Sequence, residues 1–317
     1  MLSHFADRIK DFNFDLLNRS IKSWIISILR LILITGISYL ILFPLLSKIS
    51  TAFMTRADLF DRTVFWIPKN FTLENFELAI IHMDYVESLL LTSTLALCVA
   101  FFQLASSTLV GYGFARYDFP FKKIFFALVL FTLIVPPNMV LVPYYMNFRF
   151  FNLYGLIPGD GLNLIGTYWP FILISLTGVG FRNGLFIFVM RQFFRGMPQN
   201  LEDAAYVDGA GYFQTFFRIM LPGAVPALVV VFLFSFVWQW NDVFFSRVFL
   251  GTVGEVDVLS IALRDLPEEI DYWIEHSPYL SLIINAGTLL VIGPLVVVYA
   301  FMQRYFVESV ERTGIVG

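Results

Sequence analysis

Six long apolar segments set the strongest constraint on what this chain can fold into. They are residues 24–47, 88–112, 124–148, 168–190, 223–245 and 279–302. Each is long enough to cross a bilayer as a helix, because about 20 apolar residues span the hydrocarbon core. Backbone N–H and C=O groups find no water there, so each segment is expected to pair them internally. The sequence therefore predicts an all-α integral membrane protein with six transmembrane helices.

The composition leaves no room for a sizeable soluble domain. Of the 317 residues, 58% are hydrophobic and 14% are charged, which is typical of membrane proteins. No basic cluster is present, so the chain is not expected to bind nucleic acid. Its single cysteine, Cys98, lies inside the second apolar segment, which excludes an intrachain disulfide. The three histidines show no ligand spacing and no Gly-x-Ser-x-Gly occurs, so neither a metal site nor covalent catalysis is expected.

The distribution of basic residues predicts the orientation. In the six-helix arrangement, twelve Lys and Arg residues lie on the side of both termini and six on the other side. By the positive-inside rule, both termini and residues 191–221 are expected to be cytoplasmic. The predicted organisation is a cytoplasmic arm at 1–22, a membrane domain at 23–305 and a cytoplasmic tail at 306–317.

Prolines interrupt the third apolar segment. Pro136, Pro137 and Pro143 free backbone carbonyls that need partners inside the protein or from water. This helix is therefore expected to be broken and to face a cavity instead of lipid.

The polar segment 191–221 separates the fourth and fifth apolar segments and reads as two short helices. Pro198 suits a first helical turn, and Glu202 follows early enough to favour the positive helix start. Gly209 is expected to end this helix. A second helix is predicted over 212–220. The adjacent small side chains of the first helix would let another surface approach closely.

This segment resembles the EAA loop of the membrane subunits of ABC importers. The family pattern is Glu-Ala-Ala, three residues, Gly, nine residues, Ile, any residue and Leu-Pro. The matching positions are Asp203, Ala204, Ala205, Gly209, Ile219, Leu221 and Pro222. Every spacing agrees, and the one departure is Asp203 in place of Glu. The alternative is an ordinary connector between two membrane helices.

The resemblance implies that this loop couples the membrane helices to a separate motor. No Gly-x-x-x-x-Gly-Lys-Ser/Thr occurs in the chain, so no cofactor is expected here, and partner ATPase subunits would bind ATP and Mg²⁺. In the family, the first helix of the loop sits in a groove on the ATPase. The residues expected to make this contact or its turn are Glu202, Asp203, Ala204, Ala205, Asp208 and Gly209.

Three further stretches are similar to the carbohydrate-importing branch, and specifically to the second permease subunit of maltose-type systems. They are MRQFFRGMPQNLEDAAYVDGA, WNDVFF and VPPNMVLVPYY. The resemblance implies a permease in a bacterial inner membrane that imports an oligosaccharide. Its expected partners are a homologous second permease, two ATPase subunits and an extracytoplasmic binding protein. The rival functions are an ABC permease for a non-sugar solute and an ion-coupled secondary transporter.

Polar and aromatic side chains within the apolar segments are candidates for the substrate path, since they are costly in lipid. Sugars stack their C–H faces on rings and need partners for their hydroxyls. The candidates are Asn138, Tyr144, Trp238, Trp240, Asn241 and Asp242. The alternative for the last four is an interfacial aromatic belt with a helix-ending Asn-Asp. The acidic outer loop, 247–278, is expected to be a solvated face that meets the binding protein.

Overall fold

The computed structural model describes residues 14–152, 155, 159, 161–251, 256–273 and 279–314. Apart from two isolated β-bridges, the regular structure of the described residues is helical. The chain divides into two compact units, residues 1–75 and 76–317. The predicted all-α architecture is confirmed within this described part.

The first unit is built on one long helix, α2 (Phe14–Ala52), which contains the first predicted span. A short helix, α3 (Arg56–Phe60), follows it. The loop after α3 is fixed by the buried carboxylate of Asp58, which accepts hydrogen bonds from the backbone N–H and the side-chain amide of Asn70 at 2.8 and 2.9 Å. Because α2 begins at Phe14, helix already covers part of the expected 1–22 arm. Residues 1–13 of that arm lie outside the described residues.

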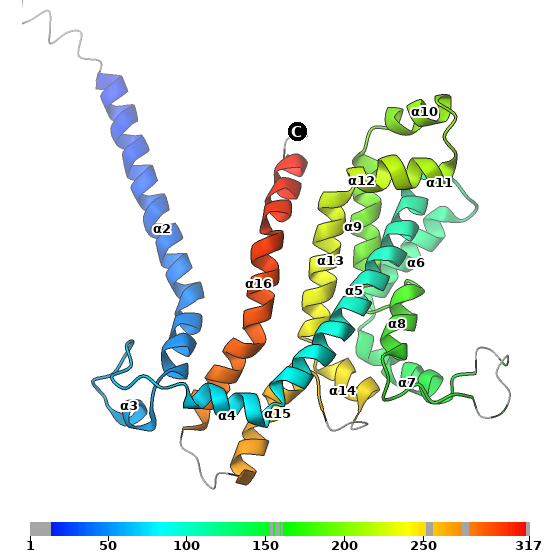
Figure 1. Ribbon diagram of the computed structural model, residues 1–317. Coiled ribbons are helices and arrows are strands. Elements are labelled where there is room, and N and C mark those ends of the chain that lie inside the picture. The colour runs from blue at the N-terminus through cyan, green and yellow to red at the C-terminus, as the bar shows by residue number, and fades with distance from the viewer. Residues whose placement is uncertain are drawn as a thin grey trace, which may run out of the picture. The chain divides into compact units, whose positions relative to one another are not determined.

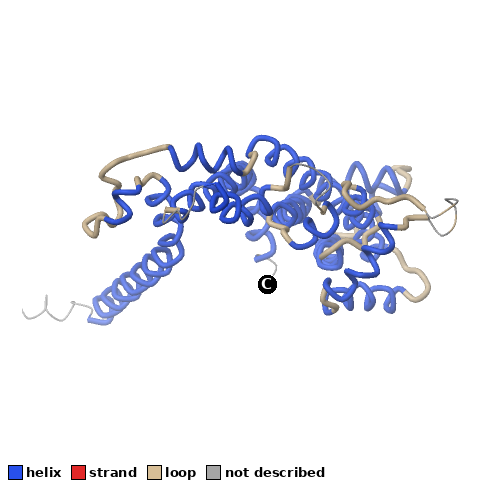
Figure 2. The backbone as a smooth tube through the Cα atoms, turned by 90° about the horizontal axis from the view of Figure 1, so that it is seen from below, coloured by secondary structure: helices blue, strands red, loops and turns tan. Residues whose placement is uncertain are grey.

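The remaining helices lie in the second unit, apart from the first two residues of α4 (Figures 1 and 2). They are α4 (Glu74–His82), α5 (Tyr85–Arg116), α6 (Lys122–Ile134), η1 (Pro137–Val140), α7 (Leu141–Arg149), α8 (Trp169–Leu176), α9 (Asn183–Gly196), α10 (Asn200–Val207), α11 (Tyr212–Thr215), η2 (Phe216–Met220), α12 (Leu221–Gly223), α13 (Val225–Trp240), α14 (Phe244–Leu250), α15 (Leu259–Trp273) and α16 (Leu280–Gly314). Figure 1 shows α10 and α11 at one end of this unit, and α7, α14 and α15 at the opposite end.

Three helices of the described residues are long and apolar enough to cross a membrane, or up to five if each bent pair forms one span. The third apolar segment is one such pair, because α6 and the segment Pro137–Arg149 meet at 100°. The predicted break at the prolines is therefore confirmed. In the second pair, the segment Tyr212–Gly223 meets α13 at 75°.

The fourth apolar segment is interrupted in a way that the sequence analysis did not predict. Helix α8 ends at Leu176 and α9 begins at Asn183. Between them, Gly178 has φ +74° and Arg182 has φ +69°. A positive φ does not fit a right-handed helix, so the segment cannot continue as one rod. The expected single helix over 168–190 is thus replaced by two shorter ones.

Helix α5 is the central element of the second unit, with α8, α9 and α13 packed against it. One apolar cluster lies toward the α10 end and includes Tyr112, Met190 and Phe216. A second cluster lies toward the other end and includes Val99 and Phe171. Both clusters therefore contain side chains from α5, and this helix links the two ends of the unit.

Candidate functional site

The first helix of the EAA-like loop, α10, is tied to α5 through Glu202. The Glu202 side chain is buried, with Oε1 accepting a 2.6 Å hydrogen bond from the Tyr112 hydroxyl. Its Oε2 lies 3.0 Å from Nε of Arg116 in an ion pair. Arg116 also donates from Nη2 to the backbone carbonyl of Met197, at 2.7 Å. A single arginine therefore holds both Glu202 and the chain just before α10.

The six residues expected to form the coupling contact do not share one surface. Glu202 is 4% exposed and Ala205 is 5% exposed. These two lie three residues apart and so point to the same side of the helix, which here faces the protein's own chain. Asp203, Ala204 and Asp208 are exposed instead. Within this chain, the Glu202 carboxylate is occupied by Tyr112 and Arg116. Its predicted contact with another subunit stays a prediction.

Gly209 ends α10 as predicted. Its φ is +82°, a conformation that glycine adopts without steric cost. The N–H of Gly209 bonds to the carbonyl of Tyr206, and the N–H of Ala210 bonds to the carbonyl of Ala205. This pair of bonds is the Schellman motif, which satisfies carbonyls left open at a helix end. The chain can therefore reverse here and start α11 at Tyr212.

A polar cavity of about 360 Å³ lies beside the same contacts. Its lining includes Arg116, Glu202 and Tyr206. Burial raises the pKa of the Tyr206 phenol above its usual value, and the charges of neighbouring groups add to this shift. Tyr206 therefore presents a neutral hydroxyl to the cavity at physiological pH.

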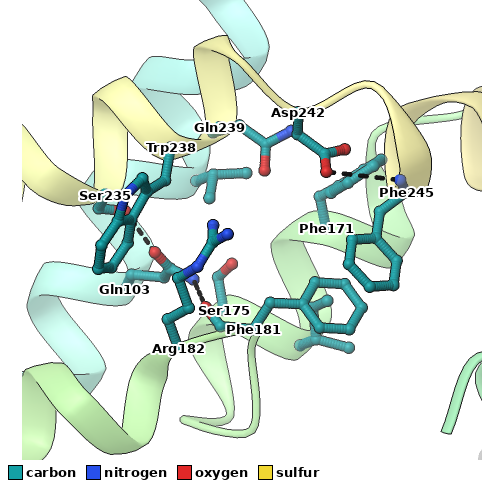
Figure 3. Close-up of a pocket in the computed structure, with 12 residues that line it drawn as sticks. Gln103, Phe171, Ser175, Phe181, Arg182, Ser235, Trp238, Gln239, Asp242 and Phe245 are labelled. Atoms are coloured by element: carbon teal, nitrogen blue, oxygen red, sulfur yellow. Dashed lines mark hydrogen bonds between the residues drawn. The ribbon is translucent and has the colours of Figure 1, made fainter. Parts of the chain in front are cut away.

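A second candidate site lies between α5, α8 and α13, beside the break that precedes α9 (Figure 3). It is a narrow cavity of about 20 Å³, which is room for about one water molecule. The lining residues are Val99, Gln103, Phe171, Ile174, Ser175, Phe181, Arg182, Ser235, Trp238, Gln239, Asp242 and Phe245. Segments far apart in the sequence thus converge on a small space with both aromatic and polar walls.

Hydrogen bonds from Gln103 hold the polar wall of this cavity together. Its Nε2 donates to the carbonyl of Phe181 at 3.0 Å, and its Oε1 accepts from the hydroxyl of Ser235. Nearby, the hydroxyl of Ser106 donates to the carbonyl of Ser175 at 2.7 Å. Gln103 thus joins α5 to Ser235 on α13. The Gln103 amide also provides a hydrogen-bond partner for the carbonyl of Phe181, which lies in the break before α9.

Arg182 projects into the cavity from that break (Figure 3). Its guanidinium carbon lies 4.5 Å from the centroid of the Trp238 ring, within the range of a cation–π contact. Across the cavity, Nε2 of Gln239 is buried and has no hydrogen-bond partner among the described residues. Asp242 accepts bonds from the N–H and hydroxyl of Ser246, at 2.6 and 2.9 Å. The cavity therefore offers a cation, an amide donor, a carboxylate and aromatic faces.

The six residues predicted for the substrate path do not converge on one place. Trp238 and Asp242 line the cavity of Figure 3. Trp240 is buried and donates to the carbonyl of Val291 on α16 at 3.2 Å, so it is a packing residue. Asn241 bonds to the carbonyl of Val237 and ends α13. The position of Asn241 agrees with the alternative in which Asn-Asp ends the helix, whereas Trp240 packs inside the protein and does not belong to an interfacial aromatic belt.

The remaining two candidates lie on the broken third segment. Asn138 is exposed on η1. Tyr144 lines a separate, largely apolar cavity of about 670 Å³ and donates to the carbonyl of Val179 at 3.3 Å. This apolar cavity borders α6, α9 and the break between α8 and α9. Its position agrees with the expectation that the broken third segment faces a cavity.

Sequence reasoning missed Arg182 and Ser235 as parts of the site. Arg182 lies within the fourth apolar segment, and a cation inside such a segment is by default a candidate functional residue. Gly178 and Gly180 just before it are the signal that the helix breaks there. A Cβ on Gly180 would lie 2.6 Å from Oδ1 of Asn183 and 3.1 Å from Nε2 of Gln103. Glycine therefore allows the break to pack against α5.

The acidic loop, 247–278, contains one ion pair, and no group of metal-ligating side chains occurs among the described residues. Arg247 forms an ion pair with Asp265, which raises the pKa of the arginine above its usual value. Burial raises the pKa of Asp257, and the charge of Asp265 adds to this shift. Residues 252–255 and 274–278 of the loop lie outside the described residues.

The comparison with known families decides what kind of protein this is. Residues 107–312 match the family described as "Binding-protein-dependent transport system inner membrane component". The chain belongs to this family. It is a permease subunit of a binding-protein-dependent ABC importer, an integral membrane transport component and not itself an enzyme. The resemblance drawn from the EAA-like loop is thus confirmed at the level of the family.

Individual relatives extend over most of this permease. It is 30% identical to a probable ABC transporter permease protein of Pyrococcus horikoshii, over 76% of this chain and 80% of the relative. It is 29% identical to an arabinooligosaccharides transport system permease protein of Halalkalibacterium halodurans, over 89% and 93%. A bacterial ABC transporter involved in the import of the acidic polysaccharide alginate contains a chain with the same fold. The TM-score is 0.67 at 20% identity, covering 90% of this chain and 98% of that one.

Proposed function

We propose that this permease forms part of the translocation pathway of an ATP-driven importer for an oligosaccharide. The observation that carries the proposal is the chemistry of the cavity in Figure 3, where the Trp238 ring, the Gln239 amide and the Asp242 carboxylate converge. Convergent polar groups on an aromatic wall suit a ligand that has C–H faces and many hydroxyls. The relative named for arabinooligosaccharide transport supports this substrate class.

The pathway is expected to need several partners. A homologous second permease would complete the transmembrane channel, two ATPase subunits would bind ATP and Mg²⁺, and an extracytoplasmic binding protein would deliver the sugar. The family description, which names binding-protein-dependent transport, supports the last of these. A cavity of about 20 Å³ is too small for a sugar. The site must therefore widen during transport, as expected for a permease that alternates between two states.

The proposed topology has six transmembrane helices in a bacterial inner membrane, with both termini and residues 191–221 in the cytoplasm. In this scheme α8 and α9 together make the fourth span. Within the second unit, Figure 1 places α10, the turn between α5 and α6, and the far end of α16 at the same end. Basic residues of the α5–α6 turn and of the far end of α16, together with those of the last part of α9 and of η2, support a cytoplasmic location of this end. They are Arg116, Lys122, Lys123, Arg191, Arg195, Arg218 and Arg304.

The exposed side of α10 is the proposed contact with the ATPase. Asp203, Ala204, Val207 and Asp208 are all exposed, and Val207 is 87% exposed. An apolar valine beside a small alanine and two carboxylates suits a groove that has an apolar floor and a basic rim. Closure of the ATPase pair would then move α10 as a rigid body.

Reconstitution of the complete importer in proteoliposomes tests the proposed function. We expect uptake of a labelled arabinooligosaccharide that requires both ATP and the binding protein. Uptake driven by an ion gradient without ATP would contradict the ABC mechanism. Uptake of amino acids or phosphate, with no oligosaccharide uptake, would contradict the substrate class.

A further inference from the structure

The ion pair between Arg116 and Glu202 differs from the other ion pairs of the described residues because both of its side chains are largely shielded from solvent. The two side chains are 11% and 6% exposed. In the pair of Lys122 with Asp118, the aspartate is 99% exposed. Buried charges lose their hydration, so each is tolerated only while its partner stays in place. The ion pair therefore restricts movement of α10 relative to α5.

The surroundings of the pair reinforce this restriction. Both carboxylate oxygens of Glu202 have a partner, one in Tyr112 and one in Arg116. The Tyr112 ring is held by Phe194 and Phe216, with ring centroids 5.2 and 4.7 Å away. Tyr112 therefore cannot follow Glu202 to a new position unless the packing on both sides of the loop changes.

We propose that Arg116, Tyr112 and Glu202 form a latch that fixes α10 to α5, so that a displacement of α10 moves α5 with it. This inference rests on the proposed coupling of α10 to an ATPase. In this arrangement Glu202 is a positioning residue that acts within its own chain, while Asp203 and its exposed neighbours meet the motor. The latch is defined as these three residues.

Helix α5 provides the connection from the latch to the cavity of Figure 3. It is one uninterrupted helix of 32 residues without proline. Gln103 on the same helix lines the cavity and bonds to Ser235 in the same wall. The nine residues from Gln103 to Tyr112 correspond to about 14 Å of helix at 1.5 Å per residue. Movement at the latch would therefore reach the cavity wall through a single stiff element.

Charge reversal in the complete importer tests the latch. The variants are Arg116→Glu, Glu202→Arg and the double variant that carries both changes. We expect each single variant to lower the amount of substrate transported per ATP hydrolysed by about tenfold or more, since it places like charges together in a buried site. The double variant should recover most of the loss. Equal impairment of the single and double variants in assembled complexes would overturn the proposal.

A matched control uses the exposed pair at the same end of the molecule. Reversing Asp118 and Lys122 separately, as Asp118→Lys and Lys122→Asp, should change the transport-to-hydrolysis ratio by less than about twofold, because exposed pairs contribute little. A loss as large as that of the buried pair would mean that any charge change here uncouples the complex, which would also overturn the latch.

A milder variant covers the case in which charge reversal prevents assembly. Tyr112→Phe removes one hydrogen bond to Glu202 and leaves the ring packing intact. We expect an assembled importer whose transport per ATP is lower by about tenfold or more, in line with the loss of one hydrogen bond to a charged group. An unchanged ratio would count against the latch.

A distance measurement separates failure of the latch from failure of the proposed function. Spin labels at Asn200→Cys on α10 and Leu109→Cys on α5, in a Cys98→Ala background, report the distance between the two helices in the assembled complex. We expect a narrow distribution that broadens in Glu202→Gln, whatever solute is carried. No broadening would overturn the latch even if sugar transport is observed, whereas absence of sugar uptake by the unmodified importer would contradict only the proposed function.

Discussion

Single glycines determine how closely α5 and α9 pack. A Cβ on Gly111 would lie 2.7 Å from Cβ of Met190 and 3.0 Å from the backbone nitrogen of Arg191. Nothing lies within 4 Å of the equivalent position on Gly113, two residues further along the same helix. The two glycines therefore have different roles, although both lie on α5.

We expect Gly111→Ala to destabilise the permease and Gly113→Ala to leave it equally or more stable. The added methyl group at Gly111 must push α9 away, and overpacking of this kind costs about 1–3 kcal/mol. At Gly113 the same change meets open space and raises helix propensity by up to about 1 kcal/mol. Thermal unfolding in detergent measures both. A similar melting temperature for the two variants would contradict the close packing of α9 against Gly111.

Arg182 has a positive φ, and its side chain lines the cavity of Figure 3. Replacing it with glycine tests the role of the side chain without straining the backbone. Arg182→Gly suits the backbone conformation and removes the guanidinium, so we expect unchanged or higher stability together with a loss of oligosaccharide uptake of about tenfold. Arg182→Asn also tolerates this φ and should show the same loss. Uptake equal to that of the unmodified importer would remove Arg182 from the proposed pathway.

Helix α10 is short, and its two sides lie in different environments. One side carries Glu202 and Ala205 and faces the chain itself, while the other carries Asp203, Ala204 and Val207 and faces outward. The adjacent alanines of the EAA-like pattern therefore lie on different sides. A bulky residue at Ala205 perturbs internal packing, so Ala204 is the position that tests contact with the motor.

We expect Ala204→Trp to lower substrate-stimulated ATP hydrolysis by the assembled importer by about tenfold, because the larger side chain obstructs the groove. The melting temperature of the permease alone should not change, since Ala204 is exposed. Ala205→Trp should instead lower the melting temperature. If Ala204→Trp keeps full stimulated hydrolysis, the exposed side of α10 is not the contact.

At the scale of the whole molecule, the second unit places its charged segments at two opposite ends. The α10 end includes Arg195 and Arg218, whereas the end with α14 and α15 includes the ion pair of Arg247 with Asp265. Clusters of apolar side chains join these ends through α5. The arrangement is that of a membrane protein with two distinct polar surfaces.

Cysteine labelling tests which surface is cytoplasmic. In a Cys98→Ala background, we expect Gln214→Cys on α11 to react with an impermeant maleimide only in inside-out vesicles. Asn147→Cys on α7 should react only in right-side-out vesicles, because the two positions lie at opposite ends of the unit. The opposite labelling pattern would place α10 on the wrong side of the membrane for contact with an ATPase.

The sequence alone determined the features that depend on a few neighbouring residues. The apolar segments predicted helices because lipid leaves no other way to satisfy the backbone. The prolines near Pro136 predicted the break in the third segment, and Gly209 predicted the end of α10. The spacing of the EAA-like loop predicted the family. Each of these signals is contained in one stretch of chain, so no knowledge of packing was needed.

The tertiary structure decided the features that depend on residues distant in sequence. Glu202 turns inward because Tyr112 and Arg116 on α5 offer it partners. Arg182 lines a cavity because the break before α9 packs against Gln103. Trp240 and Trp238 differ in role because only one of them faces α16. A side chain becomes buried or gains a hydrogen-bond partner when separate helices pack together. The residue pattern within one segment does not specify which helix that segment will pack against.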